Sequence, residues 1–217
     1  MITAKYSELC NIPSDINEHL PTLVRYASEC TTITECGVRS GVSSYAFAQG
    51  LQGRADAKIT QVDLNWHPNI ATFQKACANE GIRVNFYGMS DLECPLEQTD
   101  LLFIDTWHVY GHLKRELTRW HSYVNKYIIM HDTTVDGIHG ETIRNGWDAV
   151  KQSRDTGIPI DEIRKGLLPA IDEFLSENPE WVLRERFVNN NGLTILEKKS
   201  QYSEVVVPVI SSNTSME

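Results

Sequence analysis

The chain has 217 residues, 41% of them hydrophobic, which fits one globular domain with a sizeable core and argues against a disordered protein. Its formal net charge of −9 would repel a phosphate backbone, so nucleic acid is not expected as a partner. The opening MITAKYSELC has no targeting pattern, and no apolar run approaches the roughly 20 residues of a membrane span. We therefore expect a soluble, cytoplasmic protein with no membrane partner.

The first 30 residues predict a helical prefix, in which Pro21 is placed to start the helix PTLVRYASEC. Residues 6–26 are a candidate lid over a bound cofactor. Beyond the prefix, short runs rich in β-branched residues alternate with segments of helical period. The predicted strands, each bounded by Gly or Asp, are TTITECG, KITQVDL, RVNFYGM, DLLFID and KYIIMHD.

Two segments between these strands have a clear helical period. In HPNIATFQKACANEG the apolar face consists of Ile70, Phe73 and Cys77. In VYGHLKRELTRWHSYV the apolar stripe consists of Leu113, Leu117, Trp120 and Val124. The residues of this second helix that we expect to face water are Lys114, Arg115 and Glu116. Alternating strands and helices predict a parallel sheet with helices on both faces.

After residue 160 the pattern changes. IDEFLSENPEW predicts a helix, and WVLRERFVNN with NGLTILEKK predicts an antiparallel hairpin at one side of the sheet, joined by an Asn/Gly turn. The tail 200–217 is expected to be partly mobile, although Val205 to Ile210 could add an edge strand or bury against a partner subunit. A homo-oligomer is therefore left open. We find no repeat and no linker, and expect residues 1–217 to form a single domain.

The five cysteines are odd in number and show no C-x-x-C spacing, which argues against a disulfide framework and against a zinc knuckle. We expect them to be buried free thiols. They are Cys10, Cys30, Cys36, Cys77 and Cys94.

The first loop of the predicted sheet is TECGVRSGVSSYAFAQG. Ligands of open α/β sheets bind outside the carboxyl ends of the strands, where this loop lies. Gly37 and Gly41 allow a tight turn and a close approach of a ligand to the backbone, and Ser43 or Ser44 can cap the following helix. The same pattern also fits any tightly packed connection from a strand to a helix.

Asp63 ends the next strand, where an acid can accept both hydroxyls of an adenosine ribose. Such an acid suits a nicotinamide dinucleotide as well as S-adenosylmethionine. The loop discriminates between them, because its spacing, Glu35-x-Gly37-x-x-x-Gly41, is not the G-x-G-x-x-G that holds a pyrophosphate. An acid before the first glycine favours the cationic end of a methionine moiety.

In this order, ECGVRSGVSS, QVDLN, YGMSDL, DLLFIDTWHVYGHLKRELTRW and YIIMHDTT resemble the class I S-adenosylmethionine-dependent O-methyltransferases. The most similar branch is metal-dependent and contains the macrocin, rhamnosyl and other sugar O-methyltransferases and the cephalosporin-hydroxylase-like proteins. The resemblance covers roughly residues 20–198 and includes the final strand GLTILEKK. It implies a Rossmann-like fold, with a mostly parallel sheet of seven strands that ends in an antiparallel hairpin.

The resemblance also implies the residues of the cofactor site. Those that would shape its methionine end are Glu35, Gly37, Gly41 and Ser43. Asp63 would hold the ribose, and Asp105 would lie beside the cofactor. The residues that would line the adenine are Met89, Ser90 and Asp91. Ordinary packing is the alternative for Met89, and capping of a strand is the alternative for Ser90.

Asp105 and Asp132 each follow a buried strand, and two acids brought together at neighbouring strand ends need a cation. Carboxylate oxygens suit Mg²⁺ best, with Mn²⁺ or Ca²⁺ as alternatives. The resemblance places the metal ligands at Asp105 and at the pair His131–Asp132. Many relatives carry Glu or Asp where this chain has His131, whose imidazole would favour a softer metal or would support the ligands from behind.

His108 is the candidate catalytic base, together with Asp105, because a histidine with a pKa of about 6.5 can take a proton near neutral pH. Capping of a helix and support of Asp105 are the alternatives. TTVDGIHGETIRNGWDAV is expected to be a substrate loop, in which Trp147 either stacks on a sugar or lies in the core. Trp107 is a candidate wall of the site.

The leading hypothesis is methyl transfer from S-adenosylmethionine to a hydroxyl of a sugar, such as rhamnose, or of a glycosylated small molecule. A catechol-type phenol is an alternative acceptor. The other hypotheses are an oxidoreductase or hydroxylase on the same fold and a non-catalytic cofactor-binding scaffold. The missing dinucleotide fingerprint and the missing H-x-D triad argue against the former. The retained glycines, acids and His108 argue against the latter.

Overall fold

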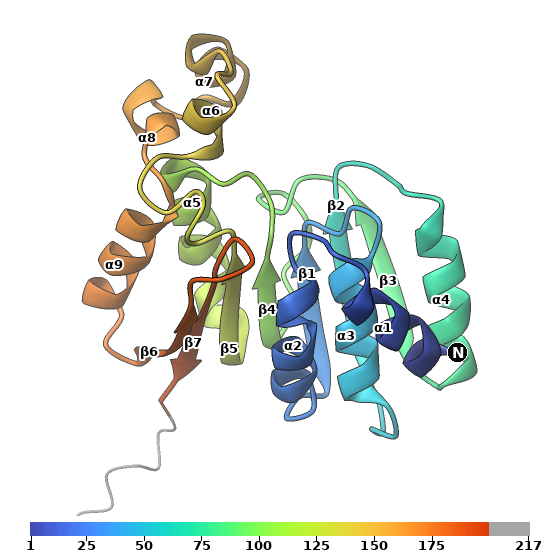
Figure 1. Cartoon of the computed structure of the whole chain (residues 1–217). Helices are drawn as coiled ribbons and strands as arrows, with labels where there is room; N and C mark the ends of the chain where they lie inside the picture. Colours follow the sequence, from blue (N-terminus) through green and yellow to red (C-terminus); the bar gives the residue numbers. More distant parts are fainter. Residues whose placement is uncertain (200–217) are drawn as a thin grey trace, which may run out of the picture.

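Seven strands form one mixed sheet in the order β3-β2-β1-β4-β5-β7-β6 in a computed structural model that describes residues 1–199 (Figure 1). The strands are β1 (Thr32–Cys36), β2 (Lys58–Asp63), β3 (Arg83–Gly88), β4 (Thr99–Ile104), β5 (Val124–His131), β6 (Trp181–Phe187) and β7 (Leu193–Lys198). β1 to β5 are parallel, whereas β7 runs antiparallel to both β5 and β6. The predicted Rossmann-like fold and the hairpin at one side are confirmed. The predicted tail strand, Val205 to Ile210, lies outside the described residues.

Helices account for most of the remaining described chain. They are α1 (Ile2–Asn11), α2 (Leu20–Ala27), α3 (Val42–Leu51), α4 (Asn69–Asn79), α5 (Tyr110–Trp120), α6 (Glu141–Arg144), α7 (Ala149–Thr156), α8 (Ile160–Arg164) and α9 (Leu167–Glu177), with short 3-10 helices η1 (Asn17–His19) and η2 (His121–Tyr123). The prefix is helical as predicted, and Pro21 lies in the first turn of α2. Its fixed φ suits that turn, where the backbone needs no donor.

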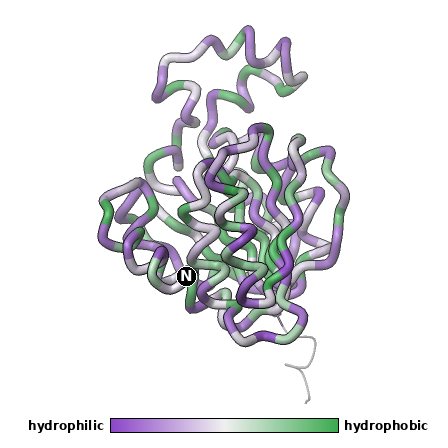
Figure 2. The backbone as a smooth tube through the Cα atoms, turned by 90° about the vertical axis from the view of Figure 1, so that its right-hand side faces the viewer, coloured by the Kyte–Doolittle hydropathy of each residue, from purple (hydrophilic) through white to green (hydrophobic). Residues whose placement is uncertain are grey.

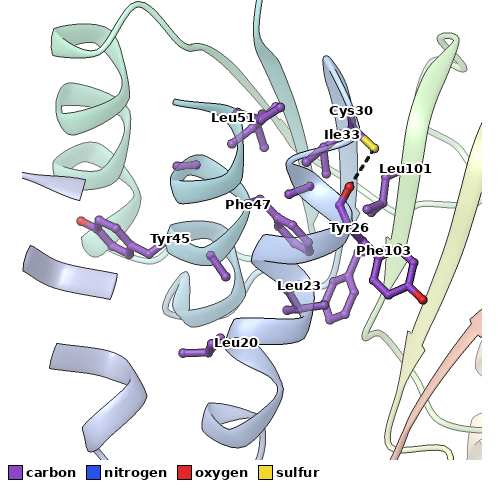
Figure 3. Close-up of a cluster of buried hydrophobic side chains, with 14 of the residues drawn as sticks. Leu20, Leu23, Tyr26, Cys30, Ile33, Tyr45, Phe47, Leu51, Leu101 and Phe103 are labelled. Atoms are coloured by element: carbon purple, nitrogen blue, oxygen red, sulfur yellow. Dashed lines mark hydrogen bonds between the residues drawn. The ribbon is translucent and has the colours of Figure 1, made fainter. Parts of the chain in front are cut away.

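One face of the sheet is covered by α1 to α4, and their apolar side chains form the larger core. Figure 3 shows this cluster, in which Phe47 of α3 meets Phe103 of β4 edge to face with ring centroids 5.2 Å apart. The thiol of Cys30 donates a hydrogen bond to the carbonyl oxygen of Tyr26 at 3.3 Å (Figure 3). The predicted free thiols are confirmed, since four of the cysteines are buried and Cys10 is half-buried.

The other face is covered by α5 and α9. Leu113, Leu117 and Trp120 are buried there as predicted, while Val124 is already the first residue of β5. The prediction that Glu116 faces water is wrong, because its side chain is only 1% exposed and accepts a hydrogen bond from the hydroxyl of Thr106. Glu116 lies one position before Leu117, at the margin of the apolar stripe. Whether a residue at this position is buried depends on a partner far away in the sequence, here Thr106.

Hydrophobic segments concentrate in the strands and the helix faces packed on them, as the hydropathy colours of Figure 2 show. The segment from α6 to α8 rises beyond the carboxyl edge of the sheet (Figure 1). A small apolar cluster of Val109, Ala149, Ile158 and Ile163 joins it to the start of α5. Within residues 1–199, no helix combines the length and the apolar character needed to cross a membrane.

Candidate active site

The ends of β4 and β5 bring four of the predicted site residues together. Asp105 follows β4, His131 ends β5 and Asp132 comes next. Asp105 Oδ1 lies 3.2 Å from His108 Nε2 and 3.3 Å from His131 Nδ1. Asp132 Oδ2 lies 3.2 Å from His108 Nδ1 and 3.5 Å from His131 Nδ1. The parallel pairing of the two strands sets this geometry, because their carboxyl ends meet at one edge.

Asp132 carries two signs of a special position. Its φ is +56°, a left-handed conformation that is uncommon for residues with a side chain but is tolerated by Asp. Its Oδ1 atom is buried and has no hydrogen-bond partner within residues 1–199. A buried carboxylate oxygen without a partner is costly, and a cation is one way to satisfy it.

The electrostatics of this cluster are those of acids and bases in close contact. Burial would lower the pKa of His108, but its hydrogen bonds to Asp105 and Asp136 raise that pKa well above the usual value. Burial also opposes the charged form of His131, yet Asp105 and Asp132 raise its pKa to about 10. Burial would raise the pKa of Asp105, whereas the two imidazoles hold it well below its usual range. Protonated histidines thus balance the acids where no other cation is bound.

The donor set fits a divalent metal ion. Asp105, His108 and Asp132 each offer a ligand atom, and these atoms lie within 4.8 Å of one another. His131 also turns Nδ1 toward Asp105, because its Nε2 faces the carbonyl oxygen of Asp15 at 3.0 Å. A histidine that donates one ring N–H to a backbone carbonyl leaves the other nitrogen free for a metal. The ions that such oxygen and nitrogen donors suit are Mg²⁺ and Mn²⁺.

A second group of residues surrounds His108 from the loop after β5. Asp136 Oδ2 lies 3.2 Å from His108 Nδ1, and Arg144 binds the same carboxylate through its Nε and Nη2 atoms. Glu141 Oε1 accepts the backbone N–H of His108 at 3.2 Å. Sequence reasoning missed these residues, because they lie in a polar stretch with neither a helical nor a strand period. An acid four residues after Asp132 was the only available signal.

The glycine loop lies directly beside this cluster. Gly37 has a φ of +84°, and a Cβ at this position would overlap the backbone carbonyl of Asp105. Gly41 has a φ of +83° and is the N-cap of α3. The two glycines therefore turn the chain out of β1 within contact of β4, as the tight-turn hypothesis requires.

Glu35 lies beneath this loop, with its side chain wholly buried. Its carboxylate accepts hydrogen bonds from Ser43 (2.5 Å), Ser44 (2.6 Å) and Gln61 (3.1 Å). Burial raises its pKa to about 7, although these hydrogen bonds oppose the shift. The prediction that Ser43 or Ser44 caps α3 is wrong, because both hydroxyls bind Glu35. Glu35 thus ties β1 to the first turn of α3.

Asp63 is half-buried at the end of β2 and holds the loop between the glycines. Its Oδ2 atom accepts the backbone N–H groups of Val38 (2.8 Å) and Arg39 (2.9 Å). Its Oδ1 atom accepts the N–H of Asn65 at 2.9 Å. These bonds fix both oxygens at the carboxyl edge of the sheet.

The three residues predicted near the adenine differ in their surroundings. Met89 is 39% exposed, so the packing alternative is wrong for it. Ser90 Oγ accepts the N–H of Leu92 in a local turn. Asp91 is buried, and its Oδ1 atom lies 3.3 Å from His112 Nε2.

Asp91 also belongs to a buried acidic pair with Glu116. Asp91 Oδ2 and Glu116 Oε2 have no hydrogen-bond partner within residues 1–199. Burial and the charge of Asp91 raise the pKa of Glu116 well above its usual value. The pKa of Asp91 is lowered, because hydrogen bonds with His112 and Glu116 outweigh the effect of burial. A proton on Glu116, which its raised pKa favours, would reduce the repulsion between the two carboxyl groups.

The segment between α1 and α2 covers the cluster from the side of the prefix. Besides the contact of Asp15 with His131, the guanidinium of Arg39 binds the Asp15 carboxylate at 2.9 Å. Asn190 in the β6–β7 turn donates to the carbonyl oxygen of Ser14 at 2.7 Å and accepts the N–H of Glu18 at 3.0 Å. The candidate lid is thus held beside the cluster by hydrogen bonds from two loops, the glycine loop through Arg39 and the β6–β7 turn through Asn190.

The two tryptophans near the site occupy different environments. Trp147 is 48% exposed just before α7, so the alternative that placed it in the core is wrong. Trp107 is half-buried, with its ring centroid 5.9 Å from that of His112. Trp107 also packs against the small apolar cluster at the base of the projecting segment, and its role as a wall of the site stays a prediction.

Comparison with known proteins gives the fold and a match to one domain family. Residues 34–133 match the family described as a methyltransferase domain. No curated protein sequence matches the chain. An O-methyltransferase from Bacillus cereus, solved with S-adenosylhomocysteine, is 16% identical with a TM-score of 0.57, over 91% of this chain and 89% of that one.

Two further solved structures share the fold. An O-methyltransferase from Streptomyces achromogenes involved in tomaymycin synthesis, in complex with S-adenosylmethionine, is 14% identical with a TM-score of 0.58, over 87% of this chain and 82% of that one. An N-methyltransferase from Bradyrhizobium japonicum is 12% identical with a TM-score of 0.51, over 86% and 97%. The chain therefore shares its fold with these methyltransferase structures, and its residues 34–133 match a methyltransferase domain.

Proposed function

We propose that the protein transfers a methyl group from S-adenosylmethionine to a hydroxyl of a sugar or of a glycosylated small molecule, with a divalent metal and with His108 as the base. The observation that carries the proposal is the cluster of Asp105, His108, His131 and Asp132 beside the glycine loop of a methyltransferase domain. The resemblance to the macrocin and rhamnosyl branch supports the sugar acceptor.

The cofactor would lie at the carboxyl edge of β1 to β4. Two of the solved O-methyltransferases hold S-adenosylmethionine or its product in this fold. Gly37 and Gly41 give this loop its tight turn beside Asp105, and Asp63 offers a carboxylate to the ribose. Met89, Ser90 and Asp91 would line the adenine, and Trp107 would be a wall of the site. S-adenosylmethionine supplies an electrophilic methyl group at this edge.

Asp105, Asp132 and Nδ1 of His131 would hold the metal. The unpartnered Oδ1 atom of Asp132 and the hydrogen bond between His131 Nε2 and Asp15 support this set. A bound divalent ion lowers the pKa of a hydroxyl beside it and orients that hydroxyl. Mg²⁺ is the first candidate, and the imidazole of His131 makes Mn²⁺ the second, with Ca²⁺ as the third.

With a metal ion in place of the second ring proton to balance Asp105 and Asp132, His108 would be neutral and could take the hydroxyl proton. Its ring is 14% exposed and lies between Asp105 and Asp132, which stabilise the charged form that proton uptake produces. This need for a base favours an oxygen acceptor, because a neutral amine already has a free lone pair. The fold alone does not decide this point, since an N-methyltransferase shares it. A catechol-type phenol would use the same groups.

The test is transfer of a labelled methyl group from S-adenosylmethionine to a panel of rhamnosides, other glycosides and catechols, with Mg²⁺, with Mn²⁺ or with EDTA. We expect metal-dependent transfer to one sugar class. We further expect Asp105→Ala and His108→Ala to lower kcat on the order of 100-fold or more. Asp161→Ala is the matched control, because Asp161 is 76% exposed on α8.

The outcomes separate the parts of the proposal. If transfer to a glycoside persists in EDTA, the proposed metal is not required, and only the methyltransferase activity stands. Transfer to catechols alone would replace the sugar by a phenol. Failure of the protein to bind S-adenosylhomocysteine, measured by calorimetry, would remove the function as a whole.

A further inference from the structure

We infer that Asp136 is the positioning residue of His108, and that Arg144 in turn fixes Asp136, so that the loop after β5 completes the catalytic base. The inference rests on the proposed role of His108 and goes beyond it. It concerns Nδ1 of His108, the ring nitrogen that does not face Asp105, and the acid that this nitrogen contacts. Neither the resemblance nor the sequence pattern assigns a role to Asp136 or Arg144.

The contact between Asp136 and His108 is short and shielded from water. Asp136 Oδ2 lies 3.2 Å from His108 Nδ1, and the Asp136 side chain is 0% exposed. Burial would raise the pKa of Asp136, but its bonds to His108 and Arg144 lower it, so the acid is charged. A charged acceptor that water cannot reach binds a ring N–H strongly.

Arg144 holds the acid in place. Its Nε atom donates to Asp136 Oδ1 at 2.6 Å, and its Nη2 atom donates to Oδ2 at 2.8 Å. Such a two-point contact fixes the plane of the carboxylate as well as its position. The Arg144 side chain itself is 42% exposed, at the end of the short helix α6. The arginine therefore couples the surface of the projecting segment to a buried acid.

Asp132 is the competing partner of the same nitrogen, because its Oδ2 atom also lies 3.2 Å from His108 Nδ1. Only the Asp136 contact has the direction of a hydrogen bond. Asp132 in addition lies 3.5 Å from His131 and is a proposed metal ligand. We therefore assign the Nδ1 proton to Asp136 and leave Asp132 to the metal site.

The backbone of His108 is held by the same loop. Glu141 accepts the His108 N–H at 3.2 Å with its side chain, and its own N–H donates to the His108 carbonyl oxygen at 3.0 Å. A side chain at Gly140 would come within 3.0 Å of that carbonyl oxygen. Main chain and ring of His108 are thus both fixed by residues 136–144.

This arrangement determines which ring nitrogen of His108 can accept a proton. A proton kept on Nδ1 by Asp136 leaves Nε2 with a free lone pair in the neutral ring. Nε2 lies 3.2 Å from Asp105 Oδ1, on the side of the proposed metal ligands. Nε2 would therefore take the hydroxyl proton, and the negative charges of Asp136 and Asp105 would stabilise the resulting imidazolium.

The first test compares wild type with Asp136→Asn, and with Asp161→Asn as the control on the same segment. We expect Asp136→Asn to lower kcat about 10- to 100-fold, with the KM for S-adenosylmethionine within about 2-fold of wild type. The second readout is independent of turnover. The Nδ1–H proton of His108, assigned by its loss in His108→Gln, should give a downfield resonance in wild type and in Asp161→Asn, and none in Asp136→Asn.

A double-mutant cycle shows whether Asp136 acts through His108. In a His108→Ala background, Asp136→Asn should cost no further activity.

Arg144→Gln is the second variant, in case Asp136→Asn does not fold. We expect Arg144→Gln to lower kcat, and Arg144→Lys to restore part of the activity. Persistence of the resonance in Asp136→Asn, or a full additional loss in the His108→Ala background, would overturn the inference. Absence of transfer by wild type itself would instead count against the proposed function, and the resonance would still decide the contact.

Discussion

The α-carbon of Gly37 packs against the backbone carbonyl of Asp105, so that a methyl group on Gly37 would overlap the carbonyl oxygen. Asp105 N–H in turn donates to the carbonyl oxygen of Cys36 at 2.8 Å. The loop expected to hold the cofactor and the first acid of the proposed metal site are therefore one packed unit. A displacement of either would move the other.

Gly37→Ala should disrupt this unit. A left-handed φ costs an alanine about 1–2 kcal/mol, and the overlap with Asp105 adds to that cost because backbone cannot give way easily. Gly53→Ala is the matched control, since Gly53 also has a positive φ of +74° but has nothing within 4 Å of a new Cβ. Urea unfolding should show a larger loss of stability for Gly37→Ala. Equal losses in the two variants would mean that the close approach to Asp105 is not important.

Mg²⁺ or Mn²⁺ should stabilise the folded protein, because a ligand that binds only the folded state adds about 2.7 kcal/mol at 100 times its Kd. Asp132→Asn should abolish this stabilisation without adding backbone strain, since Asn accepts the left-handed φ of +56° as readily as Asp. Thermal melts with metal and with EDTA measure it. The control is Asp161→Asn. A wild-type Tm that does not respond to either metal would contradict the proposed site.

The stability of the protein should fall as the pH rises through the pKa of Glu35. Its folded-state pKa is raised from 4.5 to about 7, so the folded state binds the proton more tightly than the unfolded state. The stabilisation is complete below pH 4.5 and is lost as the pH rises through 7. A shift of this size corresponds to about 3 kcal/mol.

Glu35→Gln removes this titration and should flatten the dependence. Measured by urea unfolding, the difference in stability between wild type and Glu35→Gln should shift against wild type by about 3 kcal/mol from pH 4.5 to pH 8. Glu8→Gln, at an exposed position of α1, should leave the pH dependence unchanged. Parallel curves for wild type and Glu35→Gln would show that the buried acid keeps its ordinary pKa.

Local patterns were enough to predict the strands, the hairpin and the approach of Asp105 to Asp132. A short β-branched run that ends in an acid predicts two things. Its apolar residues indicate a buried strand, and the acid at its end indicates the carboxyl edge of the sheet. Glu116 shows where local patterns fail. Its burial depends on Asp91, Thr106 and His112, which contact it only after the sheet and α5 have packed.

The loop after β5 could not be predicted for a different reason. Asp136 and Arg144 lie in a segment without period, and their contacts depend on how that loop folds back over the start of α5. Trp147 was likewise undecided, because an aromatic residue in a polar loop can either fill the core or face a ligand. Only the three-dimensional arrangement distinguishes these cases.

Trp147→Ala should weaken binding of the acceptor without affecting the cofactor. Trp147 is 48% exposed on the segment that rises beyond the carboxyl edge of the sheet, and stacking of such a ring is worth about 0.5–1.5 kcal/mol. The KM for the acceptor should therefore rise about 2- to 10-fold, with an unchanged KM for S-adenosylmethionine. Trp66→Ala is the control, because Trp66 is 51% exposed but lies on the loop after β2 and packs against Phe86. If the two variants have the same acceptor KM, the projecting segment does not bind the acceptor through Trp147.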